Sequence, residues 1–556
     1  MVGSRAGTGF DRRALLGASL ASFTAACVGC PPLPPPATGA TAKLGDAHAH
    51  LFNAADLPIA GFLQYVVIPE YLPHVPEVAL ALVDAAVTVL KAMAPTASAE
   101  ERTHIRDASP QDFANRLADR IEQQARALVP APRSFRPTEE VGHSYAALAI
   151  LLRASQPGGR LRSLSDATTV DRTYLARIAV IGRAAARPEV GVREALGQAP
   201  SGLSPGVAAR SSNDLGAVWD TIKWCYEMIL PRCRHVRDYL ATLSAPGHVT
   251  DVVVNLLVDY DAWLGDGPSA GSSMHDQLQF WNGYSQAVSS RAEIRTFAGY
   301  DPLRHAEERI VGKGHSPYWD RLSSWVDATA GRPLASGFKI YPPMGFRVFG
   351  NTGDEPAKDR SGAMVAARWK RNRWSAFGAE LDAALDQFFD LCARKRVPVV
   401  AHGRHSQEAS SDTGRFASPR FWCERAQWVF KSGAPPLRAS IAHWTETPEF
   451  EDWVPRILEM NLKGQADIFF DVAYTPEFLG GDAHGFMQKL ADIYAPVEKS
   501  GRWLMFGSDW IMLGREAGVQ RYAENAVAAI RSVTWWRDRE QLVLHDNLRR
   551  FLTRPT

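Results

Sequence analysis

The chain has 556 residues, which is more than one small domain needs and enough for one barrel-sized domain with an insertion. Hydrophobic residues make up 46% and charged residues 22% of the chain, so we expect a large packed core rather than disorder. The 62 basic and 60 acidic side chains leave a formal net charge of +2. This balance provides no electrostatic footprint for a nucleic acid, and we expect no nucleic-acid partner.

The N-terminus has the pattern of an export signal. Arg12 and Arg13 precede the apolar stretch 14–26, which is too short to span a bilayer but fits the apolar region of a secretory signal. The paired arginines resemble a bacterial twin-arginine signal, and Cys27 follows a sequence that resembles a lipoprotein cleavage site. We therefore expect residues 1–30 to be an export signal, with an unprocessed tail as the alternative.

This interpretation predicts where the protein resides. The proline-rich residues 31–42 are expected to form an extended linker between the signal and the folded body. The protein is expected to be exported in a bacterium, either free in the periplasm or held on the periplasmic side of the membrane by a lipid anchor at Cys27.

Six cysteines do not make a disulfide framework in a chain of this length. The four in the folded region are Cys225, Cys233, Cys392 and Cys423, and most of them are expected to be buried packing thiols. A bridge between Cys225 and Cys233 in an oxidising compartment stays open, because the sequence does not place their Cα atoms.

The folded body is expected to begin near residue 43 with a strand over 43–52. After it, apolar residues recur every three to four positions, which predicts helices. These helices are expected at 76–93, 113–128, 144–154, 174–186 and 215–243. Together they predict a helical insertion at about residues 75–245, after the first strand.

From about residue 250 short apolar runs alternate with amphipathic helices. Seven further strands are expected at 251–260, 294–300, 337–341, 398–402, 438–443, 468–474 and 503–508. The helices between them are expected at 277–291, 318–330, 377–396, 419–431, 450–461 and 476–495. Such alternation is typical of parallel βα units, and eight strands close a βα barrel. The predicted fold class is α/β, a (β/α)8 TIM barrel over residues 43–556 that the insertion interrupts.

Side chains that can bind metal stand at the ends of four of these strands. His48 and His50 end the first strand, and because residues two apart in a strand point to the same side, both could face one ion. His402 ends the fifth strand, His443 ends the sixth, and Asp509 follows the eighth. Since the carboxyl ends of barrel strands converge on one mouth, we expect these five side chains to lie together.

Five short segments carry these residues and their surroundings: DAHAHLFN at 46–53, GFKIYPPMGF at 337–346, VPVVAH at 397–402, IAHW at 441–444 and FGSDW at 506–510. In this combination the chain resembles the amidohydrolase superfamily, and within it the amidohydrolase-related branch, which includes decarboxylases and lactone or amide hydrolases. The resemblance covers residues 43–52 and about 250 to the C-terminus but not the insertion.

The resemblance implies a role for each of the five side chains. His48, His50, His402 and Asp509 would bind the metal, and Asp509 would also share the proton of its water. His443 would be an acid/base group or, in members with two ions, a ligand of the second ion. Three imidazoles and a carboxylate suit a zinc-like ion that lowers the pKa of its water toward about 7. We expect one divalent ion, Zn²⁺ first, with Mn²⁺ or a second ion as alternatives.

Three more residues are candidates for contact with the substrate. In members with two ions the lysine of the fourth strand is carbamylated, whereas one ion and a free lysine are commoner in the branch that this chain resembles. Lys339 is therefore expected to bind a substrate anion or to form a salt bridge at the barrel mouth. Arg404 could bind a substrate carboxylate or pair with a surface acid, and Tyr341 could line the pocket or pack in the core.

Two neighbouring features also bear on the site. Asp46 is expected to support a metal-binding imidazole through a hydrogen bond. Trp444, Thr445 and Glu446 follow His443 where the family often has a turn with glycine, so the pocket there is expected to differ.

These features predict a metal-dependent hydrolase that cleaves a C–O or C–N bond of a small carbonyl substrate with metal-activated water. A nonoxidative decarboxylase of an aromatic or unsaturated acid is one alternative, and a non-catalytic exported binding or scaffold protein is another. The insertion is expected to cap the barrel mouth, because the loop after the first strand lies on that face. A role of the insertion in forming a homo-oligomer is the alternative.

Overall fold

A computed structural model describes residues 33–34, 39, 41–67, 94, 96–97, 224, 228, 231–264, 270–327, 332–353, 370–404, 414–444, 448–516 and 518–553. The expected export signal at 1–30 with Cys27, most of the linker at 31–42 and most of the insertion lie outside these residues. The helices expected at 76–93, 113–128, 144–154 and 174–186 therefore stay predictions. Among the described residues, no helix is both long enough and apolar enough to cross a membrane.

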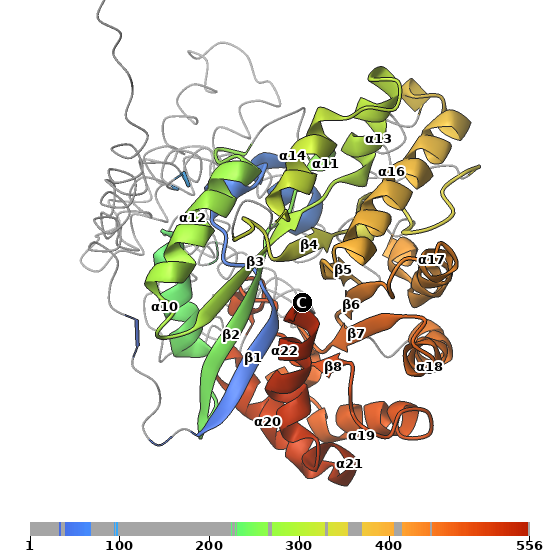
Figure 1. Ribbon diagram of the computed structural model, residues 1–556. Helices are drawn as coiled ribbons and strands as arrows, with labels where there is room; N and C mark the ends of the chain where they lie inside the picture. The colour runs from blue at the N-terminus through green and yellow to red at the C-terminus, as the bar shows by residue number, and fades with distance from the viewer. Residues whose placement is uncertain are drawn as a thin grey trace, which may run out of the picture.

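Eight parallel strands form one sheet in which the spatial order follows the chain (Figure 1). They are β1 (Ala42–Ala49), β2 (His248–Leu256), β3 (Glu293–Gly299), β4 (Gly337–Ile340), β5 (Val399–His402), β6 (Arg438–Ala442), β7 (Asp467–Asp471) and β8 (Leu504–Met505). The sheet closes where the chain after β8 meets β1, since Ala49 forms a parallel bridge with Trp510. The expected eight-stranded α/β barrel is confirmed, and the long stretch of chain between β1 and β2 fits the expected insertion.

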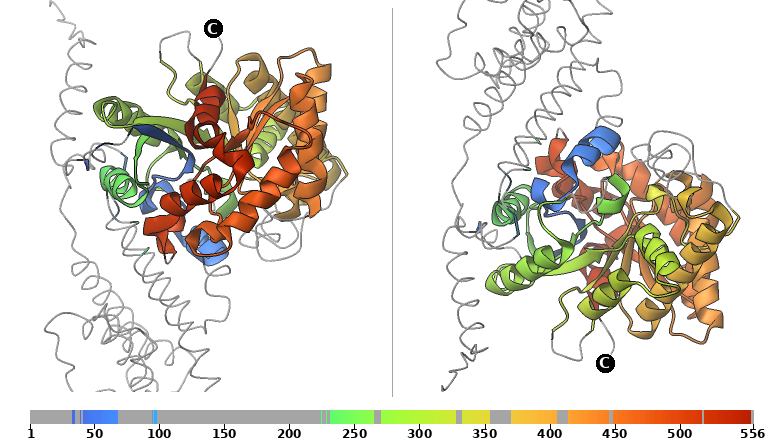
Figure 2. Two further views of the ribbon diagram at one scale, coloured as in Figure 1. Left: turned by 90° about the horizontal axis from the view of Figure 1, so that it is seen from below. Right: turned by 90° about the horizontal axis from the view of Figure 1, so that it is seen from above.

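Helices cover the outside of the barrel (Figure 2). They are α12 (Met274–Ala287), α13 (Pro302–Val311), α14 (Pro317–Trp325), α16 (Trp374–Arg394), α17 (Pro419–Lys431), α18 (Pro448–Leu462), α19 (Ala483–Tyr494), α20 (Tyr522–Ser532), α21 (Thr534–Arg537) and α22 (Asn547–Leu552). The start of α13 shows why such helices form there: Asp301 caps it by accepting from the N–H groups of Leu303 and Arg304, and Pro302 fits its first turn.

Two helices differ from the sequence expectations. Helix α13, which has only 10 residues, was not expected from the sequence. The helix expected at 476–495 is divided into a 3-10 turn, η7 (Pro476–Leu479), and α19. The division falls at Gly480, whose φ of 140° is favourable for glycine and incompatible with a helix. Asp482 then caps the new helix.

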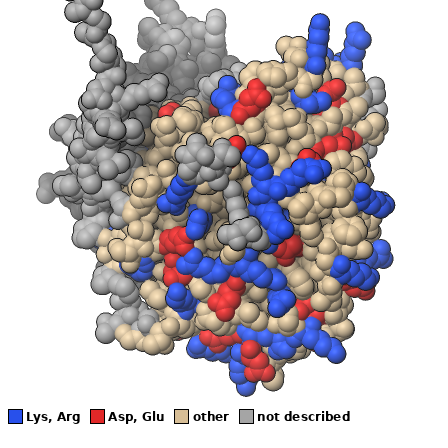
Figure 3. All heavy atoms as spheres, viewed as in Figure 1, with Lys and Arg blue, Asp and Glu red and all other residues tan. Residues whose placement is uncertain are grey.

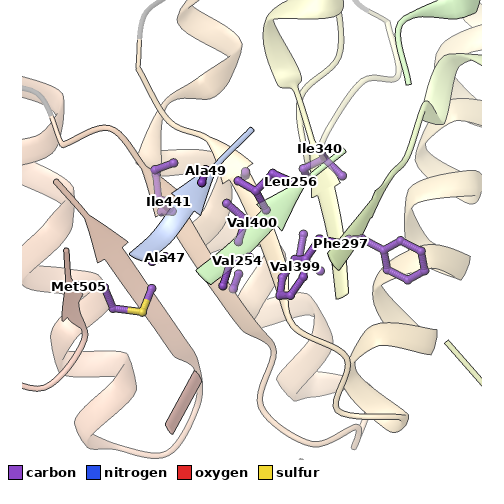
Figure 4. Packing of buried hydrophobic residues seen from close by; sticks show 14 of the residues in the cluster. Ala47, Ala49, Val254, Leu256, Phe297, Ile340, Val399, Val400, Ile441 and Met505 are labelled. Carbon is purple, nitrogen blue, oxygen red and sulfur yellow. The ribbon is translucent and has the colours of Figure 1, made fainter. Parts of the chain in front are cut away.

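The barrel strands are buried on both faces, as parallel strands covered by helices should be. Figure 4 shows apolar side chains of the barrel strands packed together, and the labelled ones are each at most 1% exposed. The labelled ones are Ala47, Ala49, Val254, Leu256, Phe297, Ile340, Val399, Val400, Ile441 and Met505. On the outside, basic and acidic side chains lie interspersed on the face drawn in Figure 3. The packed core holds the strands in place and so brings their carboxyl ends to one mouth.

Helix α10 (Arg232–Thr242) is the described end of the insertion and is anchored by a buried ion pair. The fully buried guanidinium of Arg232 binds the carboxylate of Asp56, which lies in η1 (Ala54–Asp56) just after β1. Its Nη2 also donates to the hydroxyl of Ser272 at 3.2 Å. The chain that leaves β1 and the chain that enters β2 are therefore joined at this point.

The cysteines of the described part follow two patterns. Cys392 and Cys423 are free and buried, which confirms them as packing thiols. Cys233, in α10, is disulfide-bonded, and its partner lies outside the described residues. Cys233 is therefore not a free packing thiol, and a bridge to Cys225, which the sequence left open, involves a residue outside the described part of the chain.

A buried histidine in α13 should make the stability of the fold depend on pH. The ring of His305 stacks on Trp319 with 5.0 Å between centroids, and its Nδ1 lies 2.9 Å from the Tyr300 hydroxyl oxygen. Burial, and after it the charge of Arg309, lowers the pKa of His305 from 6.5 to about 3. Between these values the unfolded chain binds a proton that the folded chain does not, so stability is lost as the pH falls through this window.

We expect His305→Gln, which keeps a polar group but does not titrate, to reduce this pH dependence. The difference in the free energy of unfolding between pH 7 and pH 5 should shrink by about 2 kcal/mol, because a group of this kind contributes roughly 1.4 kcal/mol per pH unit. Urea unfolding of both proteins at the two pH values measures it. An equal pH dependence in the variant would show that His305 is not the titrating group.

Candidate metal centre

Three of the five candidate side chains converge closely at the carboxyl end of the barrel. One ligand atom from each of His48, His443 and Asp509 lies within 4.8 Å of the others. The three residues are 0%, 4% and 9% exposed, so they face one another inside the protein rather than in solvent. They come from β1, from the turn after β6 and from the turn after β8, and closure of the barrel brings them together. This group could hold a metal ion.

His50 lies at the edge of this group. Its Nε2 is 3.3 Å from Oδ1 of Asp509, and its Nδ1 is 2.7 Å from the carbonyl oxygen of Leu256. If Nδ1 carries the proton, it donates to that carbonyl and leaves the lone pair of Nε2 directed at Asp509 and the site. A histidine that binds metal is commonly oriented in this way through its other nitrogen.

His402 lies next to His443. The ring centroids of His402 and His443 are 4.7 Å apart. The Nε2 of His402 is buried and has no hydrogen-bond partner in the part of the chain that the structure describes. A buried polar atom without a partner is costly, so this nitrogen fits a position that an ion or a substrate completes.

Lys339 of β4 lies within the cluster rather than at the rim of the barrel. It is 3% exposed, and its Nζ is 3.1 Å from Nε2 of His48. It forms no ion pair with any carboxylate of the described residues. Burial lowers the pKa of its ammonium group below the usual range, although Asp509 and Asp471 oppose this shift. Lys339 therefore faces the same space as the candidate metal ligands.

Burial also sets the charge state of the imidazoles. It is the largest cause that lowers the pKa values of His48, His402 and His443 well below 6.5. The positive charge of Lys339 lowers all three further. These rings are therefore neutral at pH 7, which is the form in which histidine binds metal.

Asp471, the last residue of β7, was not among the site residues expected from the sequence. Its Oδ2 faces Nδ1 of His48 at 3.4 Å, and its Oδ1 accepts from the main-chain N–H groups of His443 (3.0 Å) and Ala473 (3.2 Å). It thus orients one candidate ligand and the turn that carries another. Its place at the carboxyl end of a strand, the same as that of His402, was the signal that could have revealed it.

Asp46 does not have the expected contact with an imidazole. Its carboxylate accepts instead from the main-chain N–H of His48, from Ser508 and from the hydroxyl of Tyr239. The expectation of an imidazole partner for Asp46 was therefore wrong. Asp471 lies against the ring of His48 instead.

The backbone of the site requires unusual conformations. His443 and Asp509 have φ values of 61° and 62°, in the left-handed region that side chains with a Cβ seldom adopt. Such residues cost of order 1–3 kcal/mol each and concentrate at functional sites. At Gly507 an added Cβ would lie 3.0 Å from the Cβ atoms of His48 and Ala473, so a larger residue would press on the strand that carries His48.

The remaining candidates lie around this cluster. Arg404, just after β5, is partly exposed and forms no ion pair with the described residues, and its charge contributes to the lowered pKa of His402 and His443. Tyr341 is 7% exposed, and its ring centroid is 4.6 Å from that of His402. Thr445 and Glu446 lie outside the described residues. Contact of Lys339, Arg404 and Tyr341 with a substrate stays a prediction.

Comparisons of the chain with protein-family models, with curated proteins and with solved structures give no match. The structure by itself establishes a TIM-barrel-like fold with a buried group of His48, His443 and Asp509 that could hold a metal ion.

We expect Asp471→Asn to weaken metal binding while the protein stays folded. The amide oxygen can still accept from the N–H groups of His443 and Ala473, but an amide replaces the carboxylate oxygen that faces His48. Loss of such a supporting contact typically lowers metal affinity by about 10- to 100-fold. Titration of the metal-free protein with Zn²⁺ against a competing chelator measures this affinity.

A matched control is available on the same strand. Asp467 is at the other end of β7 and pairs with Arg438 at 2.8 Å, so Asp467→Asn removes an equivalent charge far from the cluster. Equal Zn²⁺ affinities of the two variants would contradict the role given to Asp471.

Proposed function

We propose that this chain is a metal-dependent hydrolase of the amidohydrolase type that cleaves a C–O or C–N bond of a small carbonyl substrate. The observation that carries the proposal is the convergence of His48, His443 and Asp509, whose ligand atoms lie within 4.8 Å of one another. They meet at the end of the barrel where such folds have their active sites. The resemblance to the amidohydrolase superfamily supports the proposal, since the DAHAH, IAH and GSD segments supply these three residues.

The residues present fit one divalent ion, with Zn²⁺ as the first candidate. His48, His50, His402, His443 and Asp509 offer imidazole nitrogens and a carboxylate oxygen, which are the usual ligands of zinc. The buried Nε2 of His402 without a partner and the directed Nε2 of His50 are further evidence for this fit. When bound, such an ion acidifies a water molecule and polarises a carbonyl group.

The side chains around the ion would then move protons and stabilise charge. Asp509 is placed to accept the proton of the attacking water, because its Oδ1 lies within 3.4 Å of both His48 and His50. His443 would pass a proton to the leaving group if it is not itself a ligand. The buried ammonium of Lys339 would stabilise the negative charge that develops on the substrate oxygen.

One observation favours decarboxylation of an aromatic or unsaturated acid as the second candidate function. Lys339 and Arg404 both lie near the cluster, and neither forms an ion pair with a described carboxylate. Two such cations suit a substrate that carries its own carboxylate. The two reactions differ in their products, because hydrolysis releases an alcohol or amine whereas decarboxylation releases carbon dioxide.

We also propose that the protein is exported and acts on a small molecule in the periplasm. The support is the sequence alone: the paired Arg12 and Arg13, the apolar stretch 14–26 and the site for a lipid at Cys27. The mass of the mature N-terminus would reveal whether the signal is removed and a lipid attached.

Metal content tests the central proposal. We expect the purified full chain to hold about one zinc or similar ion, because the cluster offers a single set of ligands. The double variant His48→Ala/His443→Ala should lose this ion and also the hydrolysis of esters, lactones or amides. Elemental mass spectrometry measures the ion, and circular dichroism confirms that the variant is folded.

Two exposed histidines make a matched control. His315 and His484 pair with Asp320 and Ser532 on the surface, so His315→Ala/His484→Ala removes two imidazoles without touching the cluster. This variant should keep the ion and the activity. A folded wild-type protein that binds no ion under metal-replete expression would contradict the proposal, and two ions per chain would contradict its single-ion form.

A further inference from the structure

A buried carboxylate ties β1 to the segment after β8. Oδ1 of Asp46 accepts from the main-chain N–H groups of His48 (2.9 Å) and Ser508 (3.0 Å). Oδ2 accepts from the hydroxyls of Ser508 (2.5 Å) and Tyr239 (2.9 Å). Asp46 is fully buried, and its four hydrogen-bond donors are all uncharged. Its position is therefore determined by these four hydrogen bonds.

This joint positions three of the candidate metal ligands. The N–H of Ser508 donates to the carbonyl oxygen of His48 at 3.2 Å, and that of Asp509 donates to the same oxygen at 2.6 Å. Trp510 N–H donates to the hydroxyl of Ser508 at 3.1 Å, and the carbonyl oxygen of Trp510 accepts from the N–H of His50. The pairing of β1 with β2 also shifts register between Asp46 and Ala49. A bulge of this kind re-aims the side chains within it.

Tyr239 is the one donor of this joint that comes from outside β1 and the β8 segment. It belongs to α10, the described end of the insertion, which lies on the β1–β2 side of the barrel (Figure 1). Besides its hydrogen bond to Asp46, its ring meets that of Trp510 edge-on with 6.1 Å between centroids. The first residue of the same helix, Arg232, is anchored to Asp56. Helix α10 thus contacts β1 before His48 and the chain after His50.

We propose that Tyr239 is a positioning residue for the metal centre. Through Asp46 and Ser508 its hydroxyl holds β1 against the segment after β8, and so sets the distance between His48 and Asp509. The inference rests on the proposed function, because it presupposes that these residues bind an ion. It gives the insertion a role in the metal centre. The hydroxyl of Tyr239 would help to position the metal ligands without contacting them.

Removal of this hydroxyl should act on the metal more than on the fold. Tyr239→Phe keeps the ring and its contact with Trp510 but leaves one lone pair of Asp46 unbound. The carboxylate would then shift toward its remaining donors in His48, which is itself a candidate ligand, and in Ser508, which directly precedes Asp509. A supporting shell has to hold its ligands to within about 0.5 Å. We therefore expect the affinity for a divalent ion to fall about tenfold or more.

The experiment compares two tyrosine variants of the full chain. Tyr300 is also fully buried, and its hydroxyl lies 2.9 Å from His305 and donates to the carbonyl oxygen of Ala384 at 3.3 Å. Tyr300→Phe therefore removes a comparable buried hydroxyl next to α13, away from β1 and β8. Each metal-free protein is titrated with Co²⁺ against a chelator, and the visible spectrum of the Co²⁺ form reports the ligand geometry.

We expect Tyr239→Phe to weaken Co²⁺ binding about tenfold and to change the spectrum. Tyr300→Phe should change neither, even if both variants lose similar thermal stability. Ser508→Ala, which removes a second donor to Asp46, should reproduce the effect of Tyr239→Phe and replaces it if that variant does not fold.

The outcomes separate this inference from the proposed function. If the wild-type protein and Tyr300→Phe bind Co²⁺ and Tyr239→Phe binds it equally well with the same spectrum, the positioning role is overturned while the metal centre stands. If the folded wild-type protein binds no Co²⁺, the proposed function fails, and the role of Tyr239 fails with it.

Discussion

Closure of the barrel between β1 and the chain after β8 is the constraint on which the rest of the structure depends. Ser508 donates to Asp46 from 462 positions away in the sequence, and Ala49 pairs with Trp510 at the same joint. Because of this closure, His48 in the first strand lies beside Asp509 in the segment after the last strand. In a sheet left open at this edge, His48 and Asp509 would lie on opposite edges and could not form a cluster.

Burial then determines what the cluster can do. The same exclusion of water that makes charged imidazoles costly keeps His48, His402 and His443 neutral, and neutral rings are metal ligands. It also brings the ammonium of Lys339 to 3.1 Å from a ring nitrogen of His48, with no ion-pairing carboxylate among the described residues. Among the described residues the site thus combines a ring nitrogen of His402 without a hydrogen-bond partner and an ammonium group without an ion-pair partner. Such an arrangement is poor for stability but suited to binding an ion and an anionic substrate.

Helix α10, the described end of the insertion, also contributes to the closure between β1 and the chain after β8. Arg232 binds Asp56 and Tyr239 binds Asp46, so α10 is held by two buried polar contacts to the chain around β1. An insertion anchored in this way can influence the candidate metal centre through the strand that carries His48. No side chain of α10 needs to reach the ligand atoms.

Much of the fold and part of the site could be predicted from the sequence, because both follow from local patterns. The apolar runs predict all eight strands, and the positions of His48, His443 and Asp509 at strand ends predict that they lie together. The partners of the carboxylates could not be predicted. Asp46 was expected to contact a ring and instead binds main-chain N–H groups and hydroxyls, whereas Asp471 takes the ring contact. These contacts join residues hundreds of positions apart and depend on a bulge and on backbone angles at His443 and Asp509, so only the tertiary structure decided them.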